Sequence, residues 1–166
     1  MASLTVRQLD DKLKTLLRLR AAREQRIPTI PRSEMLAELM RLKTGIAVSG
    51  THGKTTTSAM LAESLTAAGL EPSAIVGSNV ISWQGSALAG RGEYFVAEAD
   101  EYITDPTHDR TPRFMWQTPY ILVVTNIDFD HPDAYASLGQ VQQAFLALQK
   151  QSSFCVINMD DPASRP

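Results

Sequence analysis

The stretch VSGTHGKTTT, residues 48–57, follows the apolar run GIAV and precedes a segment with helical character. An apolar run that ends in a glycine-containing turn before a helix is typical of a buried strand whose loop leads into that helix. Such a loop presents unpaired backbone N–H groups and the positive end of the helix dipole. The stretch therefore predicts an anion site in a fold where strands are followed by helices.

The side chains of this stretch indicate which anion is bound. Gly50 and Gly53 let the backbone approach the anion without a side-chain clash. Lys54 supplies a positive charge for the β- and γ-phosphates of a nucleotide, and the Thr55 hydroxyl suits Mg²⁺. The strict P-loop pattern has glycine where this chain has Val48, so only its second half, GKT, is matched. We predict a nucleotide site; the alternative is a glycine-rich turn that only starts a helix.

Strand and helix patterns alternate along the rest of the chain. Periodicity predicts strands over residues 45–50, 73–77, 94–99, 120–126 and 154–158, and helices over 10–26, 33–43, 54–69 and 137–150. This order predicts an α/β fold, with a mostly parallel sheet flanked by helices and a helical segment at the N-terminus. Residues 78–92 and 102–118 show no clear period, and we expect loops there.

Charge divides the chain into two parts. Residues 1–43 contain ten Lys/Arg and five Asp/Glu, net 10 − 5 = +5, and residues 44–166 contain six against thirteen, net 6 − 13 = −7. We therefore expect an N-terminal helical segment and linker over 1–43, and a nucleotide-binding domain over 44–166.

Composition excludes several classes of protein. No apolar stretch approaches the roughly 18 to 20 residues of a membrane span, and the N-terminus lacks the apolar core of a secretory signal. We expect a cytoplasmic protein. The single cysteine, Cys155, lies between apolar neighbours, which favours a packed strand position over a catalytic nucleophile.

Polar side chains follow two of the predicted strands. They are Glu98, Asp100 and Glu101 after the first, and Asn126, Asp128, Asp130 and His131 after the second. Because parallel strands end at one edge of a sheet, we expect these groups to lie near the phosphate loop. Carboxylates with a neutral imidazole can hold Mg²⁺ there.

At these residues the sequence resembles the Mur ligase family, the ATP-dependent amide-forming enzymes of peptidoglycan synthesis. GIAVSGTHGKTTTSAML resembles the phosphate loop of that family, and VAEADE and VVTNIDFDHPDAY resemble its second and third signatures. The forms GTHGKTTT and EADE resemble the branches that attach L-alanine or a recycled tripeptide to UDP-N-acetylmuramate. Residues 21–40 resemble the segment that joins the UDP-sugar domain of the family to its ATPase domain.

The resemblance implies a role for each matching position. The residues implied to bind ATP are Gly50, Thr51, His52, Gly53, Lys54, Thr55, Thr56 and Asn126. Those implied to hold Mg²⁺ are Thr55, Glu98 and His131, with Asp130 as a supporting group. Lys54, Glu98 and His131 are the implied catalytic residues, and His52 contacts the substrate or shapes the turn.

The chain also departs from the family. Several members use a carbamylated lysine after the DH pair, whereas residues 132–149 contain no lysine. The segment ITDPTHDRTPRFMWQ differs from the usual alanine-adding loop, which leaves L-alanine and a peptide open as the amine substrate. Family enzymes have three domains, so the resemblance implies a truncated ATPase domain, incomplete at its C-terminus and not competent for ligation alone.

A second resemblance concerns residues 1–24, which look like the start of ribbon-helix-helix antitoxins. Their basic character fits contact with DNA phosphates, and residues 1–45 would form the DNA-binding part. A solvated basic helix is the simpler interpretation. The alternatives to the ligase module are therefore a DNA-binding regulator with a vestigial nucleotide fold, and an unrelated P-loop hydrolase or kinase.

Overall fold

The computed structural model describes residues 20, 23–26, 32–105 and 109–165. Residues Arg32–Pro166 form one compact unit. The predictions for the helix over residues 10–26, the linker at 27–31 and the antitoxin-like residues 1–24 fall wholly or mostly outside the described residues and stay predictions.

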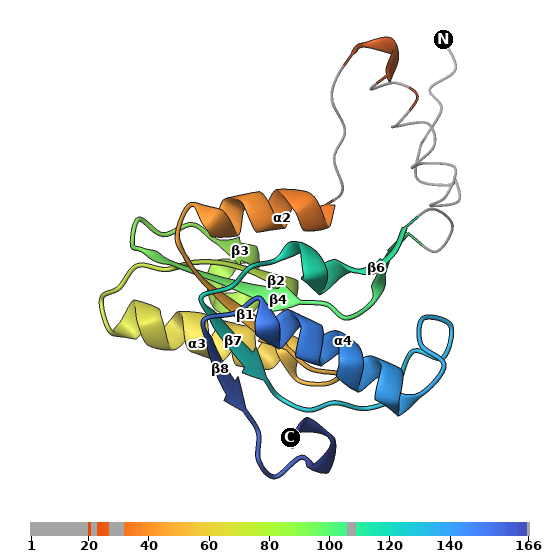
Figure 1. Cartoon of the computed structure of the whole chain (residues 1–166). Coiled ribbons are helices and arrows are strands. Elements are labelled where there is room, and N and C mark those ends of the chain that lie inside the picture. Colours follow the sequence, from red (N-terminus) through yellow and green to blue (C-terminus); the bar gives the residue numbers. More distant parts are fainter. Residues whose placement is uncertain (1–19, 21–22, 27–31, 106–108, 166) are drawn as a thin grey trace. The chain divides into compact units, whose positions relative to one another are not determined.

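A six-stranded sheet forms the centre of this unit, in the order β3-β2-β4-β1-β7-β8 (Figure 1). The strands are β1 (Thr44–Ser49), β2 (Ser73–Val80), β3 (Gly85–Leu88), β4 (Tyr94–Ala99), β7 (Ile121–Val124) and β8 (Phe154–Ile157). Neighbouring strands are parallel, except that β3 runs antiparallel to β2 at one edge. The predicted α/β fold with a mostly parallel sheet is confirmed. Because β1 lies between β4 and β7, the residues that follow these three strands meet at one edge.

Different helices cover the two faces of the sheet, and alternate residues of β1 show the division. Ile46 and Val48 pack in a cluster with α3 (Lys54–Ala67). Ala47 packs in a larger cluster with α2 (Arg32–Arg41) and α4 (Leu138–Lys150). The 3₁₀ helix η3 (Arg113–Trp116) belongs to this second layer through the fully buried Phe114. Helices on both faces give the three layers of a doubly covered sheet.

Local sequence fixes the ends of the two main helices. Helix α3 ends at Ala67, and Gly69 (φ 75°) terminates it: Gly69 N–H donates to Thr66 O and Leu70 N–H to Leu65 O, the Schellman pattern. Helix α4 begins after Ser137, whose hydroxyl accepts from Gln140 N–H. Both ends agree with the predictions from the sequence.

Two segments predicted as loops contain regular structure, so those predictions are wrong. Residues 78–92 hold the end of β2, the 3₁₀ helix η2 (Ile81–Trp83) and β3. Residues 102–118 hold the antiparallel strands β5 (Ile103–Asp105) and β6 (Asp109–Pro112), followed by η3. Strands this short depend on pairing across a hairpin, a tertiary contact that leaves little periodicity in the sequence. The last 3₁₀ helix is η4 (Pro162–Ser164).

Three further expectations concern boundaries and single residues. The predicted boundary between residues 43 and 44 falls inside the compact unit, because the buried Met40 of α2 belongs to the main core. Cys155 is a free, partly buried residue of β8 packed against the same core, as predicted, and burial raises the pKa of its thiol. Among the described residues, no helix has the length and apolar character needed to span a bilayer.

Candidate functional site

Residues 50–53 join β1 to α3 in a tight loop. Gly50 and Gly53 have φ values of 137° and 81°, which side-chain-bearing residues rarely adopt. The first intrahelical bond of α3 runs from Thr57 N–H to Gly53 O, at 3.0 Å. The N–H groups of residues 53–56 therefore precede this bond and remain available for a ligand at the helix N-terminus.

Two earlier N–H groups of the loop are already paired. Thr51 N–H donates to Asn126 O at 3.1 Å, and His52 N–H donates to Asn126 Oδ1 at 2.9 Å. The Thr51 hydroxyl accepts from Asp128 N–H at 2.7 Å. The structure thus brings Thr51, His52 and Asn126 together through contacts with one another. Their predicted role as ligand-binding residues stays a prediction.

Asn126 and Thr125, which follow β7, hold the loop of residues 50–53 at His52. Asn126 Nδ2 donates to His52 O at 2.9 Å, and Thr125 Oγ1 donates to the same oxygen at 2.7 Å. With its Oδ1 contact, the Asn126 amide therefore bonds both backbone groups of His52. A residue with these contacts sets the loop shape.

We expect Asn126→Ala to loosen the loop and weaken binding of Mg²⁺-ATP by up to about thirtyfold, because its two hydrogen bonds to His52, of about 1 kcal/mol each, are lost. Isothermal titration measures the affinity. Amide hydrogen exchange at His52 should become faster, which tests the contact itself.

The matched control for this prediction is Gln142→Ala. Gln142 of α4 also donates from its side-chain amide to a backbone oxygen, of Ala163 at 2.9 Å, but it bonds neither the loop nor Thr125 and Asn126. It should bind the nucleotide like the unmodified chain. Unchanged affinity and unchanged exchange at His52 in Asn126→Ala would contradict the assigned role.

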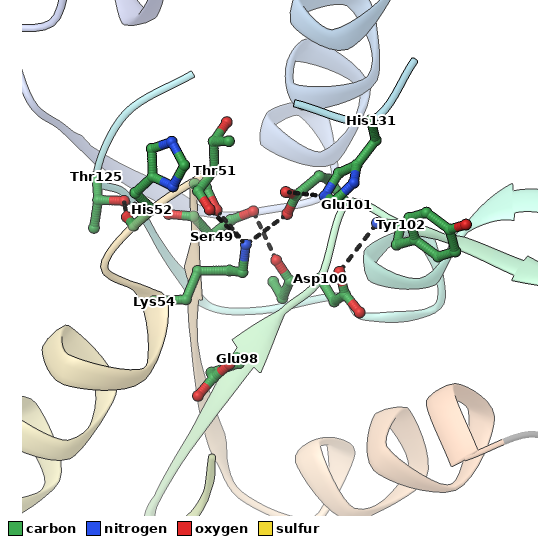
Figure 2. A network of polar contacts seen from close by, with 12 residues as sticks. Ser49, Thr51, His52, Lys54, Glu98, Asp100, Glu101, Tyr102, Thr125 and His131 are labelled. Carbon is green, nitrogen blue, oxygen red and sulfur yellow. Dashed lines mark hydrogen bonds and ion pairs between the residues drawn. The ribbon is translucent and has the colours of Figure 1, made fainter. Parts of the chain in front are cut away.

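Lys54 lies at the start of α3 with its ammonium group turned toward β4 and the loop (Figure 2). Its Nζ donates to Gly50 O (2.6 Å), Thr51 O (3.2 Å) and Glu101 Oε2 (2.9 Å). These contacts use all three donors of the ammonium group. The Lys54 and Glu101 side chains are 15% and 2% exposed, so this ion pair is largely shielded from water.

His131 reaches the same carboxylate from the segment after β7 (Figure 2). Its Nε2 lies 3.4 Å from Glu101 Oε1, longer than a well-formed hydrogen bond. The structure therefore brings Lys54 and His131 together through Glu101. Sequence reasoning had named Glu101 only as one acid among several at a strand end and had assigned it no role.

Glu98 lies apart from the group formed by Lys54, Glu101 and His131. Figure 2 shows its carboxylate apart from Lys54, Glu101 and His131, further back along β4. Glu98 Oε1 accepts from Gly77 N–H of β2 at 2.6 Å. Glu98 and His131, predicted to share a metal, are therefore not in contact here. Their predicted roles as metal ligands stay predictions.

The outer side of His131 is occupied by a polar cluster. The Tyr102 ring meets the His131 ring edge-on at 5.1 Å, and the Tyr102 hydroxyl donates to Asp133 Oδ2. That hydrogen bond raises the pKa of Tyr102 and lowers the pKa of Asp133. Arg113 lies over the Tyr102 ring and pairs with Asp100 at 2.8 Å. Asp100 Oδ1 also accepts from Tyr102 N–H at 3.1 Å. Asp100 thus contacts Arg113 and Tyr102, whereas Glu101 contacts Lys54.

The remaining predicted ligands lie on the first turn of α3. Thr55 is half-buried and Thr56 is exposed. Within the part of the chain that the structure describes, no three His, Cys, Asp or Glu residues are grouped closely enough to hold a metal.

Comparison with known protein families gives two matches. Residues 48–165 match the model of the Mur ligase middle domain. Residues 2–26 match the model of the FitA-like antitoxins with a ribbon-helix-helix fold. The second match lies almost wholly outside the described residues, so DNA binding stays a prediction.

Individual relatives agree with the first match. A UDP-N-acetylmuramate–L-alanine ligase from Solidesulfovibrio magneticus is 46% identical over 144 residues, covering 85% of this chain and 30% of that protein. Among solved structures, the UDP-N-acetylmuramate:L-alanyl-γ-D-glutamyl-meso-diaminopimelate ligase from Neisseria meningitides has a TM-score of 0.75 and 31% identity, covering 98% of this chain and 52% of that chain.

The UDP-N-acetylmuramate–alanine ligase from Thermotoga maritima has a TM-score of 0.74 and 28% identity, covering 95% of this chain and 35% of that chain. The chain thus spans about 30% of the length of the curated relatives that it matches.

Proposed function

The chain belongs to the Mur ligase family, and on that premise we propose that residues 44–166 are the ATP-binding module of a ligase. This ligase would join L-alanine or a peptide to the carboxylate of UDP-N-acetylmuramate. The observation that carries the proposal is the position of Lys54, beside unpaired N–H groups at the start of α3, inside the matched middle domain.

The proposed nucleotide contacts come from the unpaired N–H groups of the loop and from Lys54, whose present partners a phosphate would replace in part. The N–H groups of residues 53–56 and the Lys54 ammonium would bind the β- and γ-phosphates, since both favour anions at a helix N-terminus. Asn126, Thr51 and His52 would act mainly by holding the loop in shape.

We also propose a magnesium ion that enters with the nucleotide phosphates and draws on residues of this edge. Thr55 and Glu98 offer the hard oxygen ligands that Mg²⁺ prefers, and His131 is the third proposed ligand. A further sign is the buried Glu101 Oε1, which has no hydrogen-bond partner in the structure. When bound, the metal would neutralise charge on the transferred phosphoryl group.

The proposed reaction has two steps. A carboxylate oxygen of the sugar substrate attacks the γ-phosphorus, the bond to the β-phosphate oxygen breaks, and ADP leaves. The amine nitrogen then attacks the carbon of the resulting acyl phosphate. The tetrahedral intermediate loses inorganic phosphate, and the nitrogen loses a proton, giving the amide. Lys54 would stabilise charge that develops on the transferred group in the first step.

For the chain by itself we propose nucleotide binding without ligation. Ligation needs the sugar carboxylate and the amine to be held in line with the γ-phosphate. The proposed contacts of this chain engage only the nucleotide and its metal, and the chain spans about 30% of the curated relatives' length.

Calorimetric titration of the whole chain with ATP in excess Mg²⁺ tests this function. We expect saturable binding at one site. With UDP-N-acetylmuramate and L-alanine added, we expect no amide product. Absence of binding at millimolar ATP would refute the proposal, whereas ATP hydrolysis unaffected by either substrate would favour hydrolysis over ligation as the activity of this module.

A further inference from the structure

We propose that Glu101 makes nucleotide binding at this site conditional on a divalent cation. The inference rests on the proposed nucleotide-binding function. It concerns a residue that the proposed reaction does not use. Three features of Glu101 carry it: its burial, its ion pair with Lys54, and its unpartnered oxygen.

The first feature is a buried charge whose position is fixed. Counted over the whole residue, Glu101 is 1% exposed. Its backbone oxygen accepts from the Tyr135 hydroxyl at 2.6 Å, and burial raises the pKa of Tyr135 to about 12. The segment that carries Glu101 is therefore tied to the chain after β7. Because the side chain is also buried, its carboxylate would lose the ion pair without gaining water in exchange when Lys54 is taken away.

The second feature is competition for Lys54. All three donors of its ammonium group are used within the protein, one of them by Glu101 Oε2. A phosphate that binds Lys54 must therefore replace at least one of these contacts. Without nucleotide, Glu101 occupies the place of the phosphate charge.

The third feature is the unpartnered carboxylate oxygen of Glu101. Its Oε1 is buried and lacks a hydrogen-bond partner, and His131 Nε2 lies 3.4 Å from it, longer than a well-formed hydrogen bond. A triphosphate beside Lys54 would thus face a buried carboxylate of like charge with little compensation. Like charges in a shielded site repel strongly. A divalent cation that enters with the nucleotide offsets this repulsion. Glu101 therefore lowers the affinity for metal-free nucleotide.

The test compares ATP affinity in excess Mg²⁺ with ATP affinity in EDTA, at constant ionic strength, for the unmodified chain and Glu101→Gln. The glutamine keeps the shape of the side chain and removes its charge. We expect the dissociation constant in EDTA, divided by that in Mg²⁺, to fall about tenfold in Glu101→Gln, because metal-free ATP then binds more tightly.

Two further variants sharpen the result. Glu101→Asp keeps the charge and should keep the unmodified ratio, and it remains informative if Glu101→Gln does not fold. Asp100→Asn removes the neighbouring carboxylate, which pairs with Arg113 and not with Lys54, and should also keep the ratio.

An unchanged ratio in a folded Glu101→Gln overturns the inference, as does a reduced ratio in a folded Glu101→Asp. Equal weakening of both affinities in Glu101→Gln overturns it too, because Glu101 would then only hold Lys54 in place. If the unmodified chain fails to bind ATP even with Mg²⁺, the proposed function itself fails, which separates the two outcomes.

Discussion

Lys54→Ala should abolish measurable binding of Mg²⁺-ATP. The variant removes the only side-chain cation that the described residues place at the start of α3, and the charge-assisted hydrogen bonds that it would make to phosphate. It should also lower the free energy of unfolding by about 3 kcal/mol, because Glu101 is left as a buried, unpaired charge. Calorimetric titration and urea unfolding measure the two effects separately.

A double variant separates lost binding from lost stability. Lys54→Ala with Glu101→Gln removes both charges of the pair, so it should recover most of the unfolding free energy and still not bind the nucleotide. Lys150→Ala, at the exposed end of α4, serves as the control for removing a lysine and should change neither quantity. Nucleotide binding by Lys54→Ala close to that of the unmodified chain would show that the phosphates lie elsewhere.

The sequence was sufficient to predict the loop of residues 50–53 and two strands beside it, β1 and β4. GIAV before the glycines indicated β1, and the conspicuous strand YFVAEA matched β4 residue for residue. Since both strands are parallel and adjacent, the residues that follow them had to meet. His131 follows β7, which is also parallel and adjacent to β1, so the same rule places it at the edge where Lys54 lies.

The sequence was not sufficient to predict which of Glu98 and Glu101 pairs with Lys54. Alternate residues of a strand point to opposite faces, and β4 packs Val96 against α3 but Ala97 and Ala99 against the layer of α2 and α4. Glu98 shares the face of Val96 by this alternation. Only strand order and the path after Ala99 bring Glu101 to Lys54, and neither is local information. The alternation was nevertheless visible in the sequence as a signal that the two acids differ.

Gly50→Ala should be the most destabilising single change in the loop. A Cβ at this position would lie 2.1 Å from Thr125 Oγ1, and 3.0 Å and 3.1 Å from Asn126 O and N. The last two atoms belong to the backbone that anchors the loop, so they have little room to move. With the strain of φ at 137°, we expect a loss of about 3 kcal/mol or more in the free energy of unfolding, measured in urea.

Gly53→Ala is the matched comparison, because it has positive φ without the clash. Its Cβ would have Thr57 Oγ1 as nearest neighbour, at 4.0 Å, so only the left-handed backbone costs energy, about 1 kcal/mol. Adding Thr125→Ala to Gly50→Ala removes the closest contact and should restore part of the stability, but the Asn126 backbone still opposes the Cβ. If Gly50→Ala and Gly53→Ala cost the same, backbone strain alone governs the loop, and the segment after β7 does not clamp it.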